Sequence, residues 1–108
     1  VGIVSTGNHN LWQKKAWQAV FLNNNQVYFG KIQKINRNTL VLTDIYYLQA
    51  SESLASPDDT NSKLNLVKLG SEVHGPKDKM TINRSNILFW EDLKDNSRIV
   101  KVINQLLK

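Results

Sequence analysis

The order of apolar and polar positions between Ala19 and Asp44 predicts three consecutive β-strands. Apolar and aromatic residues are concentrated in the segments 17–23, 26–35 and 39–49, and asparagine-rich turns separate them. Asparagine tolerates the left-handed backbone of tight turns, so each cluster of asparagines indicates a turn between neighbouring strands. Strands joined by such short turns are typical of the antiparallel meander that begins a small β-barrel.

The second segment carries a glycine where a bend is expected. Tyr28, Gly30 and Ile32 share one face, because side chains alternate along a strand. A glycine inside a strand weakens it unless the chain bends there or another backbone approaches closely, and a closed small barrel needs such a bend. The third segment, 39–49, is almost continuously apolar or aromatic, so we expect both of its faces to be covered.

Three further strands are predicted after the longest polar segment of the chain. Residues 50–63 are rich in serine and acidic residues and are expected to form a mobile loop. The segments 64–69, 79–83 and 86–90 are short, apolar and bounded by turn residues, which is the pattern of strands.

The period of the apolar positions changes at the end of the chain. Over residues 96–108 they recur at helical spacing, at Ile99, Val102, Ile103 and Leu106. Asn96 or Ser97 can cap the first turn. The β-branched residues lower the helix propensity, so a strand over 98–103 is the alternative. We favour an amphipathic helix that closes one open end of the barrel.

The predicted fold is therefore mainly β, a small β-barrel or strongly bent antiparallel sheet with a C-terminal amphipathic helix. We expect a flexible leader at 1–15, the barrel at 16–94 and the helix, packed on the barrel, at 95–108. A chain of 108 residues can bury one core without cross-links. No apolar run reaches the roughly 18 residues of a membrane span. The chain starts at Val1 rather than methionine, which leaves open a preceding signal or anchor.

Composition and charge narrow the functional classes. The chain has no cysteine, which excludes disulfides, zinc–thiolate sites and thiol nucleophiles. The first 43 residues hold five basic and no acidic side chains, and the remainder holds nine of each, so the net charge of +5 comes from the first part. This asymmetry can indicate a polyanionic partner such as nucleic acid or anionic lipid. The interpretation we prefer is that these cations are the solvated edges of strands, because clustered basic faces usually have tighter spacing.

No set of residues has the spacing of a catalytic or cofactor site. The strongest candidate is His74, which is beside Glu72 and near Asp78 and could belong to a metal or acid–base cluster. A loop histidine is more often simply solvated. Neither a phosphate-binding glycine loop nor a nucleophile elbow occurs. The sequence therefore predicts a protein that is not an enzyme and holds no metal or cofactor.

Three aromatic residues, Tyr46, Tyr47 and Trp90, are candidates for an interaction surface. Tyr46 and Tyr47 are adjacent and point to opposite faces of a regular strand, so one of them is expected at an accessible position. Phe89 and Trp90 are likewise adjacent in a predicted strand, so one of them is expected at an accessible position. Exposed aromatic side chains can stack on the bases of single-stranded nucleic acid or contact a protein. The interpretation we prefer is that so small a domain uses most of its aromatic side chains in its core.

Two groups of segments resemble the sequence motifs of the Sm and LSm-like proteins, which form small SH3-like barrels. The first motif resembles Val20-Phe21-Leu22, Tyr28-x-Gly30-x-Ile32 and Leu40-Val41-Leu42 with Asp44, and the second resembles Ile82-Asn83-Arg84-Ser85-Asn86-Ile87. The two groups of segments lie within residues 20–44 and 82–87. The resemblance implies a small barrel that assembles into rings and binds RNA at the turn 36–39 and the corner 83–86.

The chain departs from these motifs at four positions. Asn36 stands where the family has aspartate, and Asn25 replaces the glycine of the first hairpin. Arg84 is one place late in the second motif, and Ser85 replaces its glycine. These are the positions on which the family's RNA site and the ring that forms it depend.

Phrases such as VYFGKI, VLTDIYYLQ and ILFWE also resemble a group of uncharacterised bacterial proteins. In those proteins this domain follows a single N-terminal membrane span. The resemblance implies no activity. It implies membrane tethering through a segment before Val1, with the chain itself soluble.

From these patterns we expect a non-catalytic interaction or assembly module that binds a protein partner or associates with itself through a strand edge. RNA binding is the alternative function. In that case Lys31, Lys34 and Arg37 would contact phosphates, and Arg84 or a nearby aromatic side chain would contact a base. No small-molecule substrate is indicated.

Overall fold

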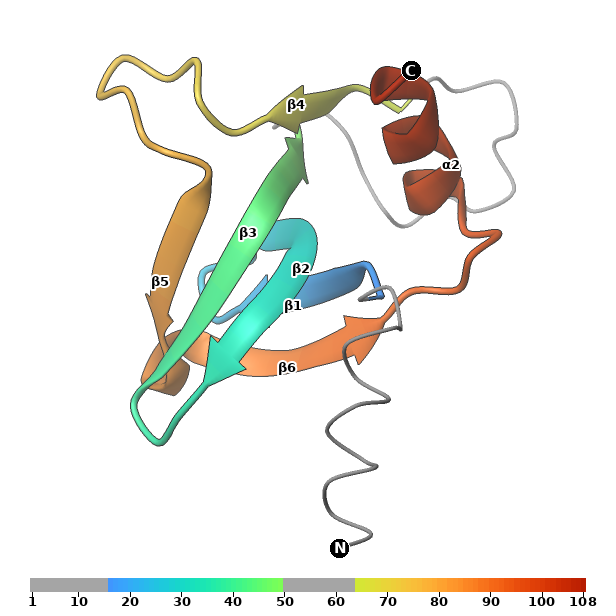
Figure 1. Cartoon of the computed structure of the whole chain (residues 1–108). Helices are drawn as coiled ribbons and strands as arrows, with labels where there is room; N and C mark the ends of the chain where they lie inside the picture. Colours follow the sequence, from blue (N-terminus) through green and yellow to red (C-terminus); the bar gives the residue numbers. More distant parts are fainter. Residues whose placement is uncertain (1–15, 50–63) are drawn as a thin grey trace, which may run out of the picture.

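The computed structural model describes residues 16–49 and 64–108, which contain six strands and one α-helix. The elements are β1 (Gln18–Leu22), β2 (Val27–Ile35), β3 (Thr39–Leu48), β4 (Leu66–Lys68), β5 (Lys79–Asn83), the 3-10 turn η1 (Arg84–Asn86), β6 (Ile87–Asp92) and α2 (Arg98–Leu106) (Figure 1). All six predicted strands are confirmed. The C-terminal helix is confirmed over its alternative, a strand. The predicted leader 1–15 and the predicted loop 50–63 lie outside the described residues.

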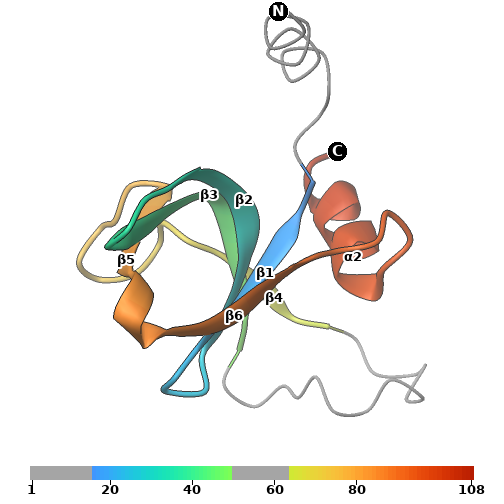
Figure 2. The ribbon, with the colours of Figure 1, turned by 90° about the horizontal axis from the view of Figure 1, so that it is seen from below.

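The strands form one antiparallel sheet in the order β4-β3-β2-β1-β6, and β5 pairs with β3 off this path. The first half of β3 pairs with β5 and its second half with β4. Among the described residues no ladder joins β5 to β6, so the sheet curls around without closing (Figure 2). The chain is thus a mainly β, strongly bent antiparallel sheet, compatible with a barrel-like fold.

Asparagine side chains shape both of the predicted hairpin turns. Asn25, between β1 and β2, has a left-handed φ of 70°. Between β2 and β3, the side-chain oxygen of Asn36 accepts hydrogen bonds from the N–H groups of Asn38 and Thr39 at 2.9 and 2.8 Å. Asparagine adopts both arrangements more readily than most residues, which explains why the two turns were visible in the sequence.

The sheet bends near Gly30, where the backbones of the paired strands β2 and β3 approach each other closely. A methyl group at Gly30 would lie 2.5 Å from the carbonyl oxygen of Thr43, so only glycine permits this approach. Asp44, one residue further along β3, has a left-handed φ of 56°. This irregularity brings Leu42 and Ile45, three positions apart, into the same core.

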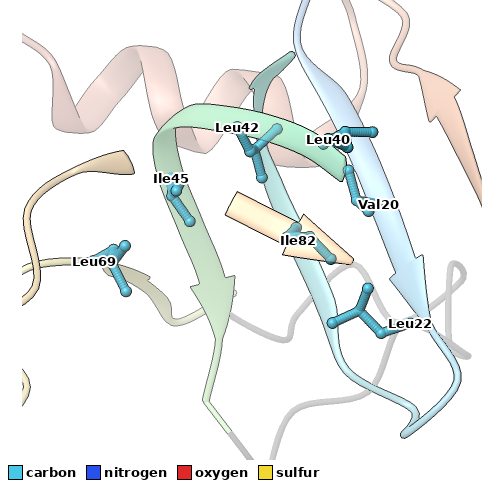
Figure 3. Close-up of a cluster of buried hydrophobic side chains, with 7 residues drawn as sticks. All are labelled: Val20, Leu22, Leu40, Leu42, Ile45, Leu69 and Ile82. Carbon is cyan, nitrogen blue, oxygen red and sulfur yellow. The ribbon is translucent and has the colours of Figure 1, made fainter. Parts of the chain in front are cut away.

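The core consists of two clusters on opposite faces of the sheet. The inner core lies within the curve of the sheet and contains Val20, Leu22, Leu40, Leu42, Ile45, Leu69 and Ile82 (Figure 3). The helix-side core contains Ala19, Phe29, Tyr46, Ile99 and Ile103. Successive residues of β1 and β3 therefore enter different clusters, which confirms that both faces of β3 are covered.

Helix α2 covers the outer face of the sheet rather than an open end of the barrel (Figure 2). Its first turn is capped by Ser97, whose side-chain oxygen accepts a hydrogen bond from the N–H of Val100 at 3.0 Å. Ile99 and Ile103 pack against Ala19, Phe29 and Tyr46. The predicted position of the helix, at an open end of the barrel, is wrong. Because side chains alternate along a strand, β1–β3 have a second apolar face, and the helix buries that face.

Candidate functional site

The turn between β2 and β3 and the corner between β5 and β6 are 48 residues apart in sequence and meet in space. The N–H of Arg84 donates to the carbonyl oxygen of Asn38 at 2.9 Å, and the Arg84 guanidinium donates to the carbonyl oxygen of Asn36 at 3.0 Å. The pairing of Thr39 with Asn83 fixes this junction. The two motif-like segments therefore form one continuous surface.

This surface contains an open depression of about 550 Å³, lined by Arg37, Asn38, Asn83, Arg84 and Ser85. The lining has two guanidinium groups and no carboxylate. The Arg84 guanidinium also lies 5.5 Å from the centre of the Trp90 ring, which restricts its position. Two arginines beside amide and hydroxyl groups can bind an anionic group such as phosphate.

The side chain of Asn36 is occupied within its own turn. Its oxygen accepts hydrogen bonds from the N–H groups of Asn38 and Thr39 and from the Thr39 hydroxyl. An asparagine held in this way shapes the loop and has no free acceptor to present to a ligand. The depression itself presents two guanidinium groups together with the polar side chains of Asn38, Asn83 and Ser85.

The other two predicted cations do not line the depression. Lys31 lies beside the helix-side core, with its ammonium group 4.6 Å from the centre of the Trp17 ring. Lys34 is exposed near the end of β2, opposite Val41. Of the four predicted nucleic-acid-binding residues, the fold brings Arg37 and Arg84 together and leaves Lys31 and Lys34 outside.

The three predicted contact aromatics differ in burial. Tyr46 is only 3% exposed and packs edge-on against Trp17, so it belongs to the helix-side core. Tyr47 and Trp90 are partly buried against the inner core. Tyr47 also donates its hydroxyl to Glu72, which raises the pKa of Tyr47 and lowers that of Glu72.

Strand β6 also exposes Leu88, which the sequence did not single out, and Phe89, which the sequence raised only as the counterpart of Trp90. Leu88 is 63% exposed and Phe89 is 48% exposed. Phe89 stacks on Phe21 of β1 with ring centres 4.5 Å apart. Leu88 lies at an irregularity of the β1–β6 ladder, where Phe21 pairs with Phe89 but Leu22 pairs with Ile87. The sequence indicates that Phe89 and Trp90 lie on opposite faces, because side chains alternate along a strand, but not which of the two is exposed.

The two carboxylates predicted to cluster with His74, Glu72 and Asp78, make hydrogen bonds and an ion pair that hold their loop in place. Glu72 accepts hydrogen bonds from Tyr47 and from the N–H of Gly70, at 2.8 Å for the latter. Asp78 accepts the N–H of Ile45 at 2.8 Å and pairs with Lys68 at 2.6 Å. Both carboxylates thus fasten the loop 69–78 to β3 and β4. His74 is exposed beside them.

Residues 16–49 and 64–108 contain neither a cluster of metal-ligating side chains nor a membrane-spanning helix. There, no three or more histidine, aspartate or glutamate side chains gather as they would around a metal ion. In the same residues, no helix has the length and apolarity needed to cross a bilayer.

Comparison of the whole chain with protein-family models and with curated proteins gives no match.

Proposed function

We propose that the chain is a non-catalytic interaction and assembly module built on a small β-barrel of the Sm or SH3-like kind. The sheet order, the one-turn corner η1 and the tight approach at Gly30 support this assignment. The observation that carries the function is the pair of incomplete edges. In the described residues β5 pairs only with β3, and β6 pairs only with β1.

A free strand edge can bind a strand from another molecule through its backbone groups. The edge strand β6 also presents Leu88 and Phe89, and exposed apolar side chains next to such an edge favour protein contact. The partner is another protein or a second copy of this chain. The non-catalytic part of the proposal is supported by the use of Glu72 and Asp78 as loop fasteners.

A photo-crosslinking amino acid at Leu88, compared with one at Leu106, tests this function in the native cell. Leu106 is a matched control because it is similarly exposed, at 54%, but lies on α2. We expect a defined crosslinked product from position 88 and none from position 106. Equal crosslinking at both positions, or none at either, would contradict contact through β6. Sedimentation from micromolar to millimolar concentration then separates self-association from a different partner.

The depression at Arg37 and Arg84 favours a second candidate function, the binding of single-stranded RNA. Its two guanidinium groups can neutralise phosphates, and Trp90 lies beside Arg84. The departures from the Sm motifs weigh against base-specific contacts, because the side-chain oxygen of Asn36 already accepts hydrogen bonds within its turn. The ligand is accordingly recognised through its backbone charge more than through its sequence.

Fluorescence anisotropy with short U-rich and A-rich RNA, at low and moderate salt, tests this candidate. For Arg37→Gln we expect weaker binding of both RNAs and a salt slope smaller by about one, because one phosphate contact is lost. Lys94→Gln is the control, since Lys94 is exposed and lies between β6 and α2. Binding weaker than tens of micromolar for both RNAs at low salt would eliminate the candidate.

A further inference from the structure

The open edge of β6 presents backbone groups in the arrangement of a docking strand. Leu93 donates its N–H to the carbonyl oxygen of Trp17 at 2.8 Å, which makes these two residues a hydrogen-bonded pair. Alternation in an antiparallel ladder then turns the backbone groups of Phe89 and Glu91 toward β1. Within residues 16–49 and 64–108, the N–H and C=O groups of Trp90 and Asp92 consequently face an edge without a partner strand.

The side chains along this edge have a distinct chemistry. Phe89 and Glu91 lie on the outer face of the sheet, because they pair with Phe21 and Ala19. Phe89 is 48% exposed. Glu91 is exposed, and its side-chain carboxylate makes no ion pair or hydrogen bond with any described residue. The outer face therefore offers an aromatic ring and, two residues later, an unpaired carboxylate.

We propose that this edge of β6 binds an extended segment of another protein in which a lysine or arginine precedes an apolar residue by two positions. Charge complementarity places the cation beside Glu91, and the apolar side chain lies beside Phe89. The order follows from antiparallel addition, in which the added strand passes Glu91 before Phe89. Every ladder of the sheet is antiparallel, and antiparallel pairing is the more stable kind.

A second copy of β6 fits this edge less well. In a β6–β6 pair centred on Trp90, each Phe89 would lie opposite the Glu91 carboxylate of the other copy, and no cation would be supplied. The inference rests on the proposed interaction function and names the chemistry of the partner at one edge.

The test is a titration of the 15N-labelled chain with two synthetic peptides, followed by amide chemical shifts. Both peptides have ten residues of alternating serine and threonine, with one phenylalanine. Two positions before it, one peptide carries lysine and the other glutamate. We expect the lysine peptide to shift the amides of Trp90 and Asp92, to slow their hydrogen exchange, and to bind about fivefold more tightly than the glutamate peptide.

Two variants and one control separate charge from backbone docking. Glu91→Lys should invert the preference between the peptides, whereas Asp95→Lys makes the same change in charge beyond the end of β6 and should leave the preference unchanged. Asp92→Pro should abolish binding of both peptides, because it removes an N–H that faces the open edge and leaves the β1–β6 ladder in place. The remaining amide spectrum reports whether each variant is folded.

Three outcomes would overturn the inference. They are unshifted Trp90 and Asp92 amides at millimolar peptide, equal affinity for both peptides, and shifts of these amides with protein concentration alone, which would make a second copy the occupant. If the peptides fail while crosslinking at Leu88 but not at Leu106 succeeds, the interaction function stands and only this partner is lost. If both experiments fail, the interaction function fails as well.

Discussion

Replacing Gly30 by alanine tests the close approach of the β2 and β3 backbones, on which the curvature of the sheet depends. The added methyl group would lie 2.5 Å from the carbonyl oxygen of Thr43 and 3.0 Å from Cγ of Leu42. The leucine side chain can turn away, but the carbonyl belongs to the backbone of β3 and is held in the ladder with β2. Relief of the contact therefore requires the two strands to separate at the bend.

Overpacking of this kind costs about 1–3 kcal/mol. Alanine also restricts the unfolded chain, which returns about 0.4–1 kcal/mol. We therefore expect Gly30→Ala to lower the free energy of unfolding by about 1–2 kcal/mol. With a urea dependence of about 1–1.5 kcal/mol per molar, the midpoint should fall by roughly 1 M.

Urea unfolding followed by tryptophan fluorescence measures this shift. Gly75→Ala is the matched control, because nothing lies within 4 Å of the added methyl group and the only cost is the left-handed φ of 63°. The amides of β2 and β3 should shift in the Gly30 variant and stay in place in the control. An unchanged midpoint for Gly30→Ala, with unchanged amides in β3, would refute the claim that this approach requires glycine.

Ser97→Ala removes the acceptor of the Val100 N–H and should cost about 1 kcal/mol, seen as a melting temperature lower by several degrees in calorimetry; an unchanged melting temperature would contradict the cap. Asn25→Gly should raise the melting temperature, because φ is 70° and glycine adopts it without strain. A lower melting temperature would show that the asparagine side chain stabilises the turn by more than the relief of this strain. The Glu72 pKa is lowered by the Tyr47 hydroxyl, so this contact stabilises the fold above the usual glutamate pKa of 4.5 and is lost as the pH falls through the lower folded value. Tyr47→Phe should therefore reduce the loss of stability below pH 4.5 in acid titrations followed by fluorescence, and an acid profile identical to that of the parent chain would contradict it.

The candidate site was only partly predictable from sequence. Arg37 and Arg84 were found because each belongs to a short motif-like segment, and the ladder of β3 with β5 does bring them together. Lys31 was selected on charge alone, and its contact with Trp17 depends on the face that it shares with the helix-side core. Adjacent aromatics in a strand show that two faces exist, but not which face a helix will cover. Tyr46 was therefore a candidate for contact, although it is buried beneath α2.

The sequence by itself determined the elements whose causes are local. The asparagines predict the two hairpin turns, and the alternation of apolar and polar residues predicts the strands. The helical spacing of apolar residues after Ser97 predicts the helix. Each of these features depends on backbone preferences within a few residues. Only the tertiary structure decided which segments meet. Contacts between residues far apart in the chain place α2 on the outer face and let Glu72 and Asp78 fasten loop 69–78. They also decide that, among residues 16–49 and 64–108, β6 pairs on one side only. Such contacts are chosen by the burial of apolar surface and by hydrogen-bond geometry in three dimensions, which local sequence patterns do not encode.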